Sequence, residues 1–198
     1  IPAVREPISR VRSEFKHTHG SYIKAWDYCP SAEGSAGDKF GRETFINFLN
    51  NTQNGWGMVN RQARMLAGCG TKARCTLSET ELYERAALHL LQVDTFSIAG
   101  RFAEAILLAA YEFKWDFEPF RIVSDGRSAS LLDWDVDDEV QALIIAVNGA
   151  DEALFEFASA LMDARISQLQ ARTGIDEVPT LTCSEDLCQF DRPVSFAS

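Results

Sequence analysis

Hydrophobic positions recur at intervals of three and four residues along most of the chain, which predicts a predominantly helical protein. The first helix is predicted to start at Pro7, because a proline in the first turn of a helix loses no hydrogen bond. One side of this helix is an apolar stripe made of Ile8, Val11 and Phe15. The other side carries Ser9, Ser13 and His17.

The same periodicity predicts several further helices. The stretches "RETFINFLNN" (42–51) and "VNRQARMLAG" (59–68) are each predicted to be helical, the second until Gly68. Ser78 and Glu81 form a capping-box pattern that opens a helix through about Gln92. Later helices are predicted over residues 102–113, 135–147 and 151–170, and the loop "CPSAEGSAGDKFG" (29–41) is predicted to lie at the surface. His89 is interpreted as a packed structural residue because leucines flank it.

Two short apolar stretches predict strands. They are "IPAV" at the start of the chain and "DTFSIAG" (94–100), and "RIVSDGRSAS" (121–130) adds a strand end and a loop. We expect a helix-dominated α/β fold in which a small parallel sheet is flanked by helices on both faces. Residues 1–172 are predicted to form one domain, and residues 173–198 an irregular tail.

The charge of the chain is acidic overall but uneven. The 198 residues carry a formal net charge of −10 and are 46% hydrophobic, as expected for a globular unit. Nucleic-acid binding is not expected, because the chain has no long basic stripe, and no apolar run is long enough to span a bilayer. The first 16 residues are nevertheless basic: they contain Arg5, Arg10, Arg12 and Lys16.

The five cysteines leave two interpretations open. Cys69 and Cys75, and likewise Cys183 and Cys188, are close enough in sequence to form small disulfide loops in an oxidising compartment. Five reduced thiols in a cytosolic protein fit the same sequence. No metal site is predicted, because no CxxC pair occurs and the histidines do not cluster with the cysteines.

The stretch "VREPISRVRSEF" (4–15) raises the question of an anion. A strand that ends at Arg5 and turns through Glu6 and Pro7 into a helix would bring a guanidinium, free backbone N–H groups and hydroxyls together, as a phosphate requires. The same sequence would also fit a helix whose basic residues simply face solvent.

The order Arg5-Glu-Pro-x-x-Arg10-x-x-Ser13 resembles the 3′-phosphate-binding motif of sulfotransferases that use 3′-phosphoadenosine-5′-phosphosulfate (PAPS), specifically the carbohydrate sulfotransferases of the Golgi. In that family the arginine that closes the strand and the serine eight positions later hold the 3′-phosphate of the cofactor. The resemblance therefore implies that Arg5 and Ser13 bind this phosphate, and that Arg10 matches the intermediate arginine of the motif.

Further segments resemble the heparan sulfate 6-O-sulfotransferases in the same order. They are "SEFKHTHG", "NRQARMLAG", "IAGRFAEAILLAAYEFKW", "SDGRSAS" and "NGADEALFEFASALMDARISQL". The third departs from the family, because Ala99 and Arg101 stand where a threonine or leucine and a threonine or glutamate are expected. The matches extend to about residue 170.

The resemblance implies further candidate site residues, each with a structural alternative. Arg127 could close over the cofactor phosphates while Gly126 lets the backbone approach, or the two could be a turn glycine beside a surface arginine. His17 could orient substrate or cofactor, or be part of a solvent-exposed histidine pair with His19. The residues that could line an acceptor groove also fit a helix that packs and caps: Asn60, Arg61 and Arg64.

Two functions remain open. The first is a PAPS-dependent O-sulfotransferase of the Golgi lumen or another secretory compartment, with a carbohydrate acceptor. The family's 5′-phosphosulfate loop and catalytic base have no match in this chain, so we expect both in a segment upstream, through which alone we expect any membrane attachment. The second is a non-catalytic sulfotransferase-like scaffold or subunit of a larger assembly, which fits the acidic charge better than an enzyme acting on polyanions.

Overall fold

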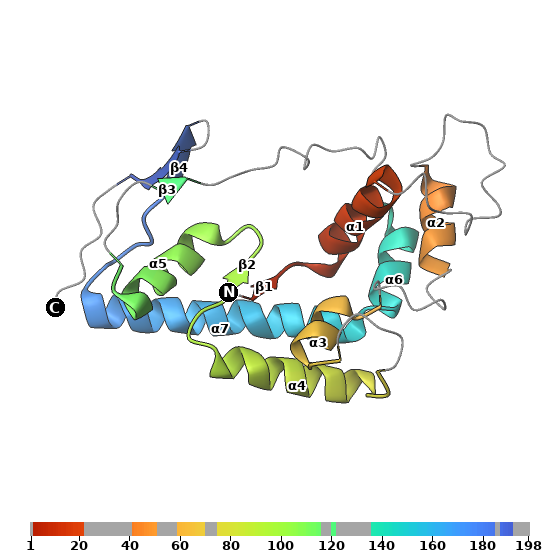
Figure 1. Ribbon diagram of the computed structural model, residues 1–198, viewed down its shortest axis with the longest axis horizontal. Coiled ribbons are helices and arrows are strands. Elements are labelled where there is room, and N and C mark those ends of the chain that lie inside the picture. The colour runs from red at the N-terminus through yellow and green to blue at the C-terminus, as the bar shows by residue number, and fades with distance from the viewer. Residues whose placement is uncertain are drawn as a thin grey trace. The chain divides into compact units, whose positions relative to one another are not determined.

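The computed structural model describes residues 2–21, 41–50, 59–69, 75–115, 120–121, 136–184 and 187–191. Helices dominate this part of the chain, as predicted (Figure 1). The helices are α1 (Pro7–Ser21), α2 (Arg42–Asn50), α3 (Arg61–Leu66), α4 (Glu79–Gln92), α5 (Phe102–Phe113), α6 (Asp138–Ala146) and α7 (Gly149–Thr173). The strands are β1 (Ala3–Val4), β2 (Ser97–Ile98), β3 (Phe120–Arg121), β4 (Leu181–Ser184) and β5 (Leu187–Phe190).

The chain divides into two compact units, and each is built from segments that are distant in sequence. Unit 1 comprises Ile1–Arg5, Ala87–Arg127 and Phe155–Ser198. Unit 2 comprises Glu6–Ala86 and Ser128–Leu154.

The core of unit 2 is a cluster of apolar side chains from three helices. The buried members are Val11 and Phe15 of α1, Phe45 and Leu49 of α2, and Val140 and Ile144 of α6. Phe15 and Phe45 meet edge to face with ring centroids 4.9 Å apart, an arrangement that aromatic rings favour. The apolar stripe predicted for the first helix is therefore the side that α1 buries.

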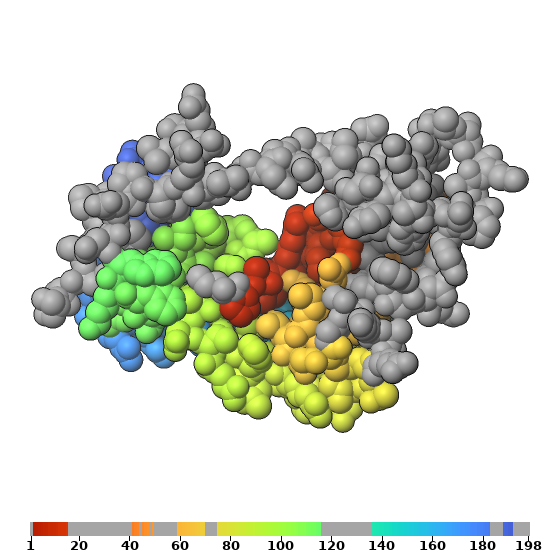
Figure 2. All heavy atoms as spheres, viewed as in Figure 1, coloured from red at the N-terminus to blue at the C-terminus, as the bar shows by residue number. Residues whose placement is uncertain are grey.

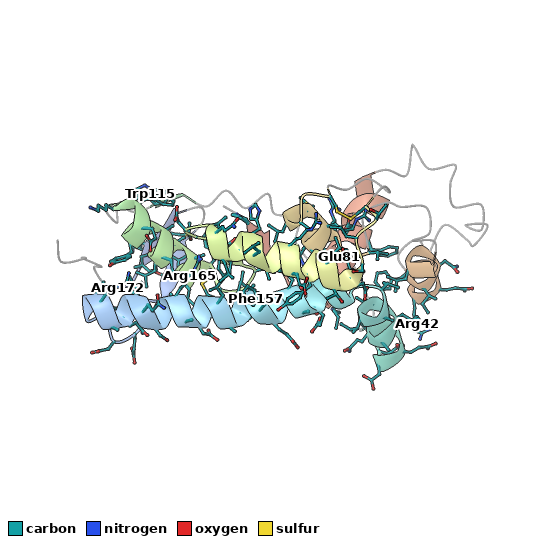
Figure 3. All side chains as sticks on the ribbon, turned by 90° about the horizontal axis from the view of Figure 1, so that it is seen from below. Arg42, Glu81, Trp115, Phe157, Arg165 and Arg172 are labelled. Carbon is teal, nitrogen blue, oxygen red and sulfur yellow. A yellow bond between two sulfur atoms is a disulfide. The ribbon has the colours of Figure 1, made fainter. Side chains whose placement is uncertain are left out.

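The periphery of unit 2 adds an ion-pair cluster next to this core. Arg42 of α2 pairs with Asp137, at 2.7 Å, and with Glu139, at 2.5 Å (Figure 3). Asp137 is also the N-cap of α6 and accepts a hydrogen bond from the Val140 N–H. The guanidinium of Arg42 and this backbone N–H lower the pKa of the Asp137 carboxyl.

Unit 1 contains the predicted parallel pair of strands. Ala3 pairs with Ser97 and Val4 with Ile98, and α5 contacts β2. Because Val4 is fully buried and Ile98 is 2% exposed, this pair lies in the interior of the unit. The small parallel sheet is thus confirmed, although each strand has only two residues.

The capping box at the start of α4 forms as predicted. The Ser78 N–H donates to the Glu81 carboxylate at 2.8 Å, and the Glu81 N–H donates to the Ser78 hydroxyl at 3.3 Å (Figure 3). The interpretation of His89 was wrong, because this side chain is exposed. The helical period turns Ala86 and Leu90 inward and places His89 on the outer face of α4. Figure 2 shows α4 as yellow-green spheres.

The C-terminal segment differs from the irregular tail that the sequence predicts. Strands β4 and β5 pair antiparallel and β3 pairs with β5, which gives a three-stranded sheet in the order β3-β5-β4. Cys183 and Cys188 lie opposite each other in this register, and Cys188 is disulfide-bonded. In unit 2, Cys69 and Cys75 form a disulfide, which is one of the two interpretations that the sequence left open for this pair.

Candidate functional site

The largest concentration of buried polar groups lies in unit 2, where α1, α3, α6 and α7 meet at their ends. Four polar or charged residues of this unit are almost inaccessible to solvent: Arg10 (8% exposed), Asn60 (1%), Asn148 (0%) and Asp151 (0%). Buried polar groups are costly unless they are hydrogen-bonded, so the partners of these four decide what the cluster does.

Asn60 and Asp151 cap each other's helices. The Asn60 Oδ1 atom accepts hydrogen bonds from the N–H groups of Ala150 (2.9 Å) and Asp151 (3.1 Å), in the first turn of α7. In return the Asp151 carboxylate accepts from the N–H groups of Gln62 (3.2 Å) and Ala63 (2.7 Å), in the first turn of α3. The N-termini of both helices are satisfied in this way, although Asn60 makes no side-chain cap on its own helix.

Asn148 connects this pair of caps to two further helices. Its Oδ1 atom accepts from the Asn60 N–H at 2.9 Å and from the Arg10 Nη2 at 2.8 Å. Its Nδ2 group donates to the Ile144 carbonyl near the end of α6, at 2.9 Å. The Asn60 Nδ2 group donates to Glu79 at 2.8 Å. Both side-chain amides are therefore fixed in orientation by the groups that surround them.

Arg10 supplies the positive charge of the cluster. Its Nη1 donates to Glu14 at 2.9 Å, and its Nε lies 3.3 Å from the Asp151 carboxylate. Glu14 also pairs with Arg61, which is partly exposed. Burial lowers the pKa of Arg10, and burial likewise raises the pKa of Asp151, while the opposite charge of each acts against these shifts. Removal of Arg10 would leave the buried carboxylate of Asp151 without its ion-pair partner, which typically costs about 3–5 kcal/mol.

The start of α1 also differs from the sequence prediction of free backbone N–H groups. The Glu6 carboxylate accepts the N–H groups of Ile8 and Ser9, both at 2.7 Å. A carboxylate at this position favours the helix through its dipole and occupies the donors that an anion would otherwise use. A phosphate in this region would consequently be held by side chains rather than by the end of α1.

The predicted site residues fall into three groups. Arg5 directly follows β1 in unit 1 and is exposed, and Ser13 lies on α1 in unit 2 and is half-buried. Arg10 is engaged in the buried cluster, which does not favour direct contact with a ligand. The side chain of His17, and both Gly126 and Arg127, lie outside the described residues.

The three residues considered for an acceptor groove support the packing and capping alternative. Asn60 is buried and cannot line a groove, which corrects that prediction. Its left-handed backbone (φ 47°) brings its side chain to α7 instead of to solvent. Arg61 is bound to Glu14, and Arg64 is half-buried on α3.

Sequence reasoning missed Glu14, Asn148 and Asp151. The stretch "NGAD" (148–151) spans the boundary between the two helices predicted over residues 135–147 and 151–170. An asparagine followed by an acidic residue in the first turn is typical of a helix N-terminus. The pattern shows that Asp151 can cap a helix. It does not show that the helix is α3, 88 residues away.

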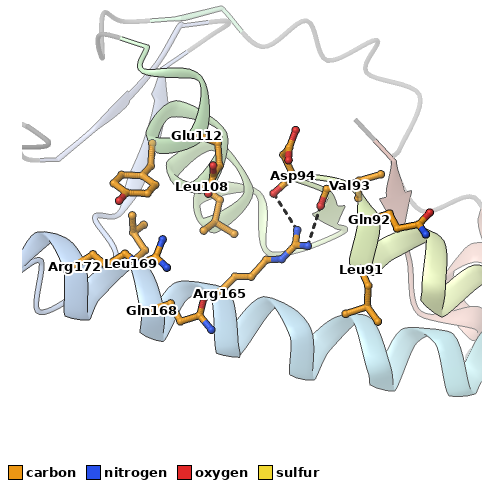
Figure 4. A pocket seen from close by; sticks show the side chains of 11 residues that line it. Leu91, Gln92, Val93, Asp94, Leu108, Glu112, Arg165, Gln168, Leu169 and Arg172 are labelled. Carbon is orange, nitrogen blue, oxygen red and sulfur yellow. Dashed lines mark hydrogen bonds between the residues drawn. The ribbon is translucent and has the colours of Figure 1, made fainter. Parts of the chain in front are cut away.

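Unit 1 contains a shallow hollow of about 220 Å³ (Figure 4). Arg165 on α7 reaches across its floor and donates to the carbonyls of Leu90 (3.3 Å), Val93 (2.8 Å) and Asp94 (3.0 Å) at the end of α4. Burial lowers the pKa of Arg165. Because its guanidinium caps the C-terminus of α4, the residue has a structural role in the hollow.

Arg101, which departs from the sulfotransferase pattern, has a structural role in the same unit. It donates to the Ser159 carbonyl at 3.3 Å and to Asp163 at 2.5 Å, and it also pairs with Glu104. Arg101 thereby joins the start of α5 to α7.

Comparison of the chain with models of protein families, with curated proteins and with solved structures found no match. The resemblance to sulfotransferases therefore depends on the motif residues alone. Among the described residues, no three histidine, cysteine or acidic side chains gather so that they could hold a metal ion. Within the same part of the chain, no helix has both the length and the apolar composition needed to cross a bilayer.

Proposed function

We propose that this chain carries the 3′-phosphate-binding part of a PAPS-dependent O-sulfotransferase that acts on a carbohydrate hydroxyl. One observation carries the proposal: a short strand, β1, ends at the buried Val4 immediately before the exposed Arg5, and a helix begins at Pro7 with Ser13 almost two turns along it. The resemblance requires this order of strand, arginine, helix and serine. Arg5 and Ser13 belong to different units, so their assignment to one ligand rests on the spacing in the sequence.

The residues of the chain fit one part of the cofactor better than the rest. Arg5 offers a planar guanidinium suited to a phosphate, and Ser13 offers a neutral hydroxyl. The end of α1 does not add donors, because Glu6 occupies them. PAPS would supply the sulfuryl group, and these two residues would hold its 3′-phosphate. The proposal assigns no catalytic base to this chain.

The disulfides support a secretory location for the proposed enzyme. Cys69 is bonded to Cys75, and Cys188 is also disulfide-bonded. Disulfides are more common in proteins of oxidising compartments than in cytosolic ones. The Golgi lumen is therefore the proposed location, in agreement with a carbohydrate acceptor.

Calorimetric titration tests the proposal with two nucleotides. The chain should bind 3′-phosphoadenosine-5′-phosphate (PAP) more tightly than 5′-AMP, because only PAP has a 3′-phosphate. Arg5→Ala should weaken PAP binding by about 1.5–3 kcal/mol and Ser13→Ala by about 1 kcal/mol, with little effect on AMP. Arg12→Ala is the matched control, since it removes the same charge from α1, and it should change PAP binding by less than about 0.5 kcal/mol.

A specific observation favours the second candidate, a non-catalytic scaffold. Arg10, the intermediate arginine of the motif, is paired with Asp151 inside unit 2, where it stabilises the fold. Equal affinity for PAP and AMP, or no effect of Arg5→Ala, would refute the sulfotransferase proposal and support the scaffold.

A further inference from the structure

Helix α1 is held on two sides. On the first, Val11 and Phe15 are fully buried against α2 and α6. On the second, Arg10 and Glu14 lie one turn apart and are paired with each other. Arg10 also contacts Asn148 and Asp151, and Glu14 also pairs with Arg61. Apolar packing resists separation of the helices, while directional hydrogen bonds resist rotation of α1 about its axis.

The third side of α1 carries the serines. Each residue advances a helix by about 100°, so Ser13 lies roughly 60° from Arg10 and about 160° from both Val11 and Phe15. Ser9 lies roughly 40° from Ser13, on the same side. The direction in which Ser13 points is therefore set by the two sides that are held, and the polar side is the nearer of the two.

The polar side is anchored to a residue that cannot move independently. Asp151 is fully buried and accepts two backbone N–H groups of α3 in addition to its contact with Arg10. Its own backbone N–H is bound by Asn60.

We propose that Arg10 and Asp151 are positioning residues for the phosphate contact of Ser13. This inference rests on the proposed function. It gives the intermediate arginine of the motif a role different from that of a ligand: Arg10 fixes the rotation of α1 so that the Ser13 hydroxyl faces the 3′-phosphate. The Arg10–Asp151 pair and the Arg10–Asn148 hydrogen bond are the contacts that fix the orientation of α1 about its axis.

A double-mutant cycle on the whole chain tests the proposal, with PAP and 5′-AMP as probes. Asp151→Asn keeps a side-chain oxygen for α3 but removes the charge that holds Arg10. It should weaken PAP binding by up to about fivefold, the loss expected for Ser13→Ala, and leave AMP binding unchanged. The double variant Asp151→Asn/Ser13→Ala should bind PAP no more weakly than Ser13→Ala alone, because both changes remove one contact.

Two further variants complete the experiment. Asp163→Asn is the matched control: it makes the same substitution on α7, at a carboxylate that pairs with Arg101 and is 67% exposed, and it should leave both affinities unchanged. If Asp151→Asn does not fold, Glu14→Gln takes its place in the cycle, since it weakens the hold on Arg10 from the other end.

The outcomes separate the two proposals. A wild-type chain with equal affinity for PAP and AMP overturns the proposed function and this inference with it. A wild-type preference for PAP that Asp151→Asn or its substitute leaves intact overturns the inference alone. So does a double variant whose loss is the product of the two single losses, or a loss that affects AMP as much as PAP, because either would indicate general damage to the fold.

Discussion

Replacement of Asn60 with alanine should destabilise the protein strongly for its size. The side chain is 1% exposed and makes three hydrogen bonds. Its Oδ1 atom accepts the N–H groups of Ala150 and Asp151, and its Nδ2 group donates to Glu79. Alanine can make none of them, and the space that the amide leaves is too enclosed for bulk water to replace all three.

The magnitude follows from three contributions that overlap. Loss of a helix N-cap costs about 0.5–2 kcal/mol, and a buried N–H left without an acceptor costs about 1–3 kcal/mol. Alanine at φ 47° adds about 1 kcal/mol, since asparagine tolerates the left-handed region better. The lost N-cap and the unsatisfied N–H groups are partly the same interaction, so these contributions cannot simply be added. We therefore expect Asn60→Ala to lower the free energy of unfolding by about 2–4 kcal/mol.

Urea unfolding followed by circular dichroism measures this loss of stability. Two control variants separate the contribution of the left-handed backbone from that of the hydrogen bonds. Asn60→Gly should be about 1 kcal/mol less destabilising than Asn60→Ala, because glycine adopts a positive φ without steric cost. Lys114→Ala should change stability by less than about 0.5 kcal/mol, because Lys114 is also left-handed (φ 53°) but exposed. A loss below about 1 kcal/mol for Asn60→Ala would refute the mutual capping of α3 and α7 as a stabilising feature.

Two smaller predictions concern exposed positions. Lys114→Gly should stabilise the protein by up to about 1 kcal/mol in the same unfolding assay, because Lys114 ends α5 in the left-handed conformation; a loss of stability would contradict this. Asp137→Asn keeps an N-cap for α6 but removes the ion pair with Arg42. Because the pKa of Asp137 is lowered in the folded state, its stabilising contribution is present above the ordinary value of 3.8 and is lost as the pH falls below it. The stability difference between wild type and Asp137→Asn should therefore stay constant as the pH falls from neutral to the ordinary value of 3.8 and shrink below it, and a difference that does not change below 3.8 would contradict the assignment.

Local features of the sequence were sufficient to predict most helices and the first strand pair. The capping box of Ser78 and Glu81 and the apolar stripe of α1 depend on residues within one or two turns, so their spacing determines them. His89 shows the limit of neighbour-based reasoning: its flanking leucines suggested burial, but its position in the helical period places it outside.

The candidate site could be predicted only in part, because its partners are distant in sequence. The sequence around Arg10 does not show whether its side chain faces solvent or a buried carboxylate. Its partners Asn148 and Asp151 lie about 140 residues away, so no local pattern connects them to it. Glu6 was a detectable cap, since it directly precedes a proline at the first helical position. Strands β4 and β5 were missed because each has only four residues and their pairing, not their composition, defines them.

The mutual capping of α3 and α7 has a consequence for the order in which the protein acquires structure during synthesis. Helix α3 has six residues, far fewer than the roughly 12–15 that an isolated helix needs in water. Its first turn is completed by a carboxylate 88 residues further along the chain. The segment around Asn60 therefore leaves the ribosome before Asp151 has been synthesised. Until Asp151 emerges, the first turn of α3 has no cap, and the segment is accessible to chaperones and proteases.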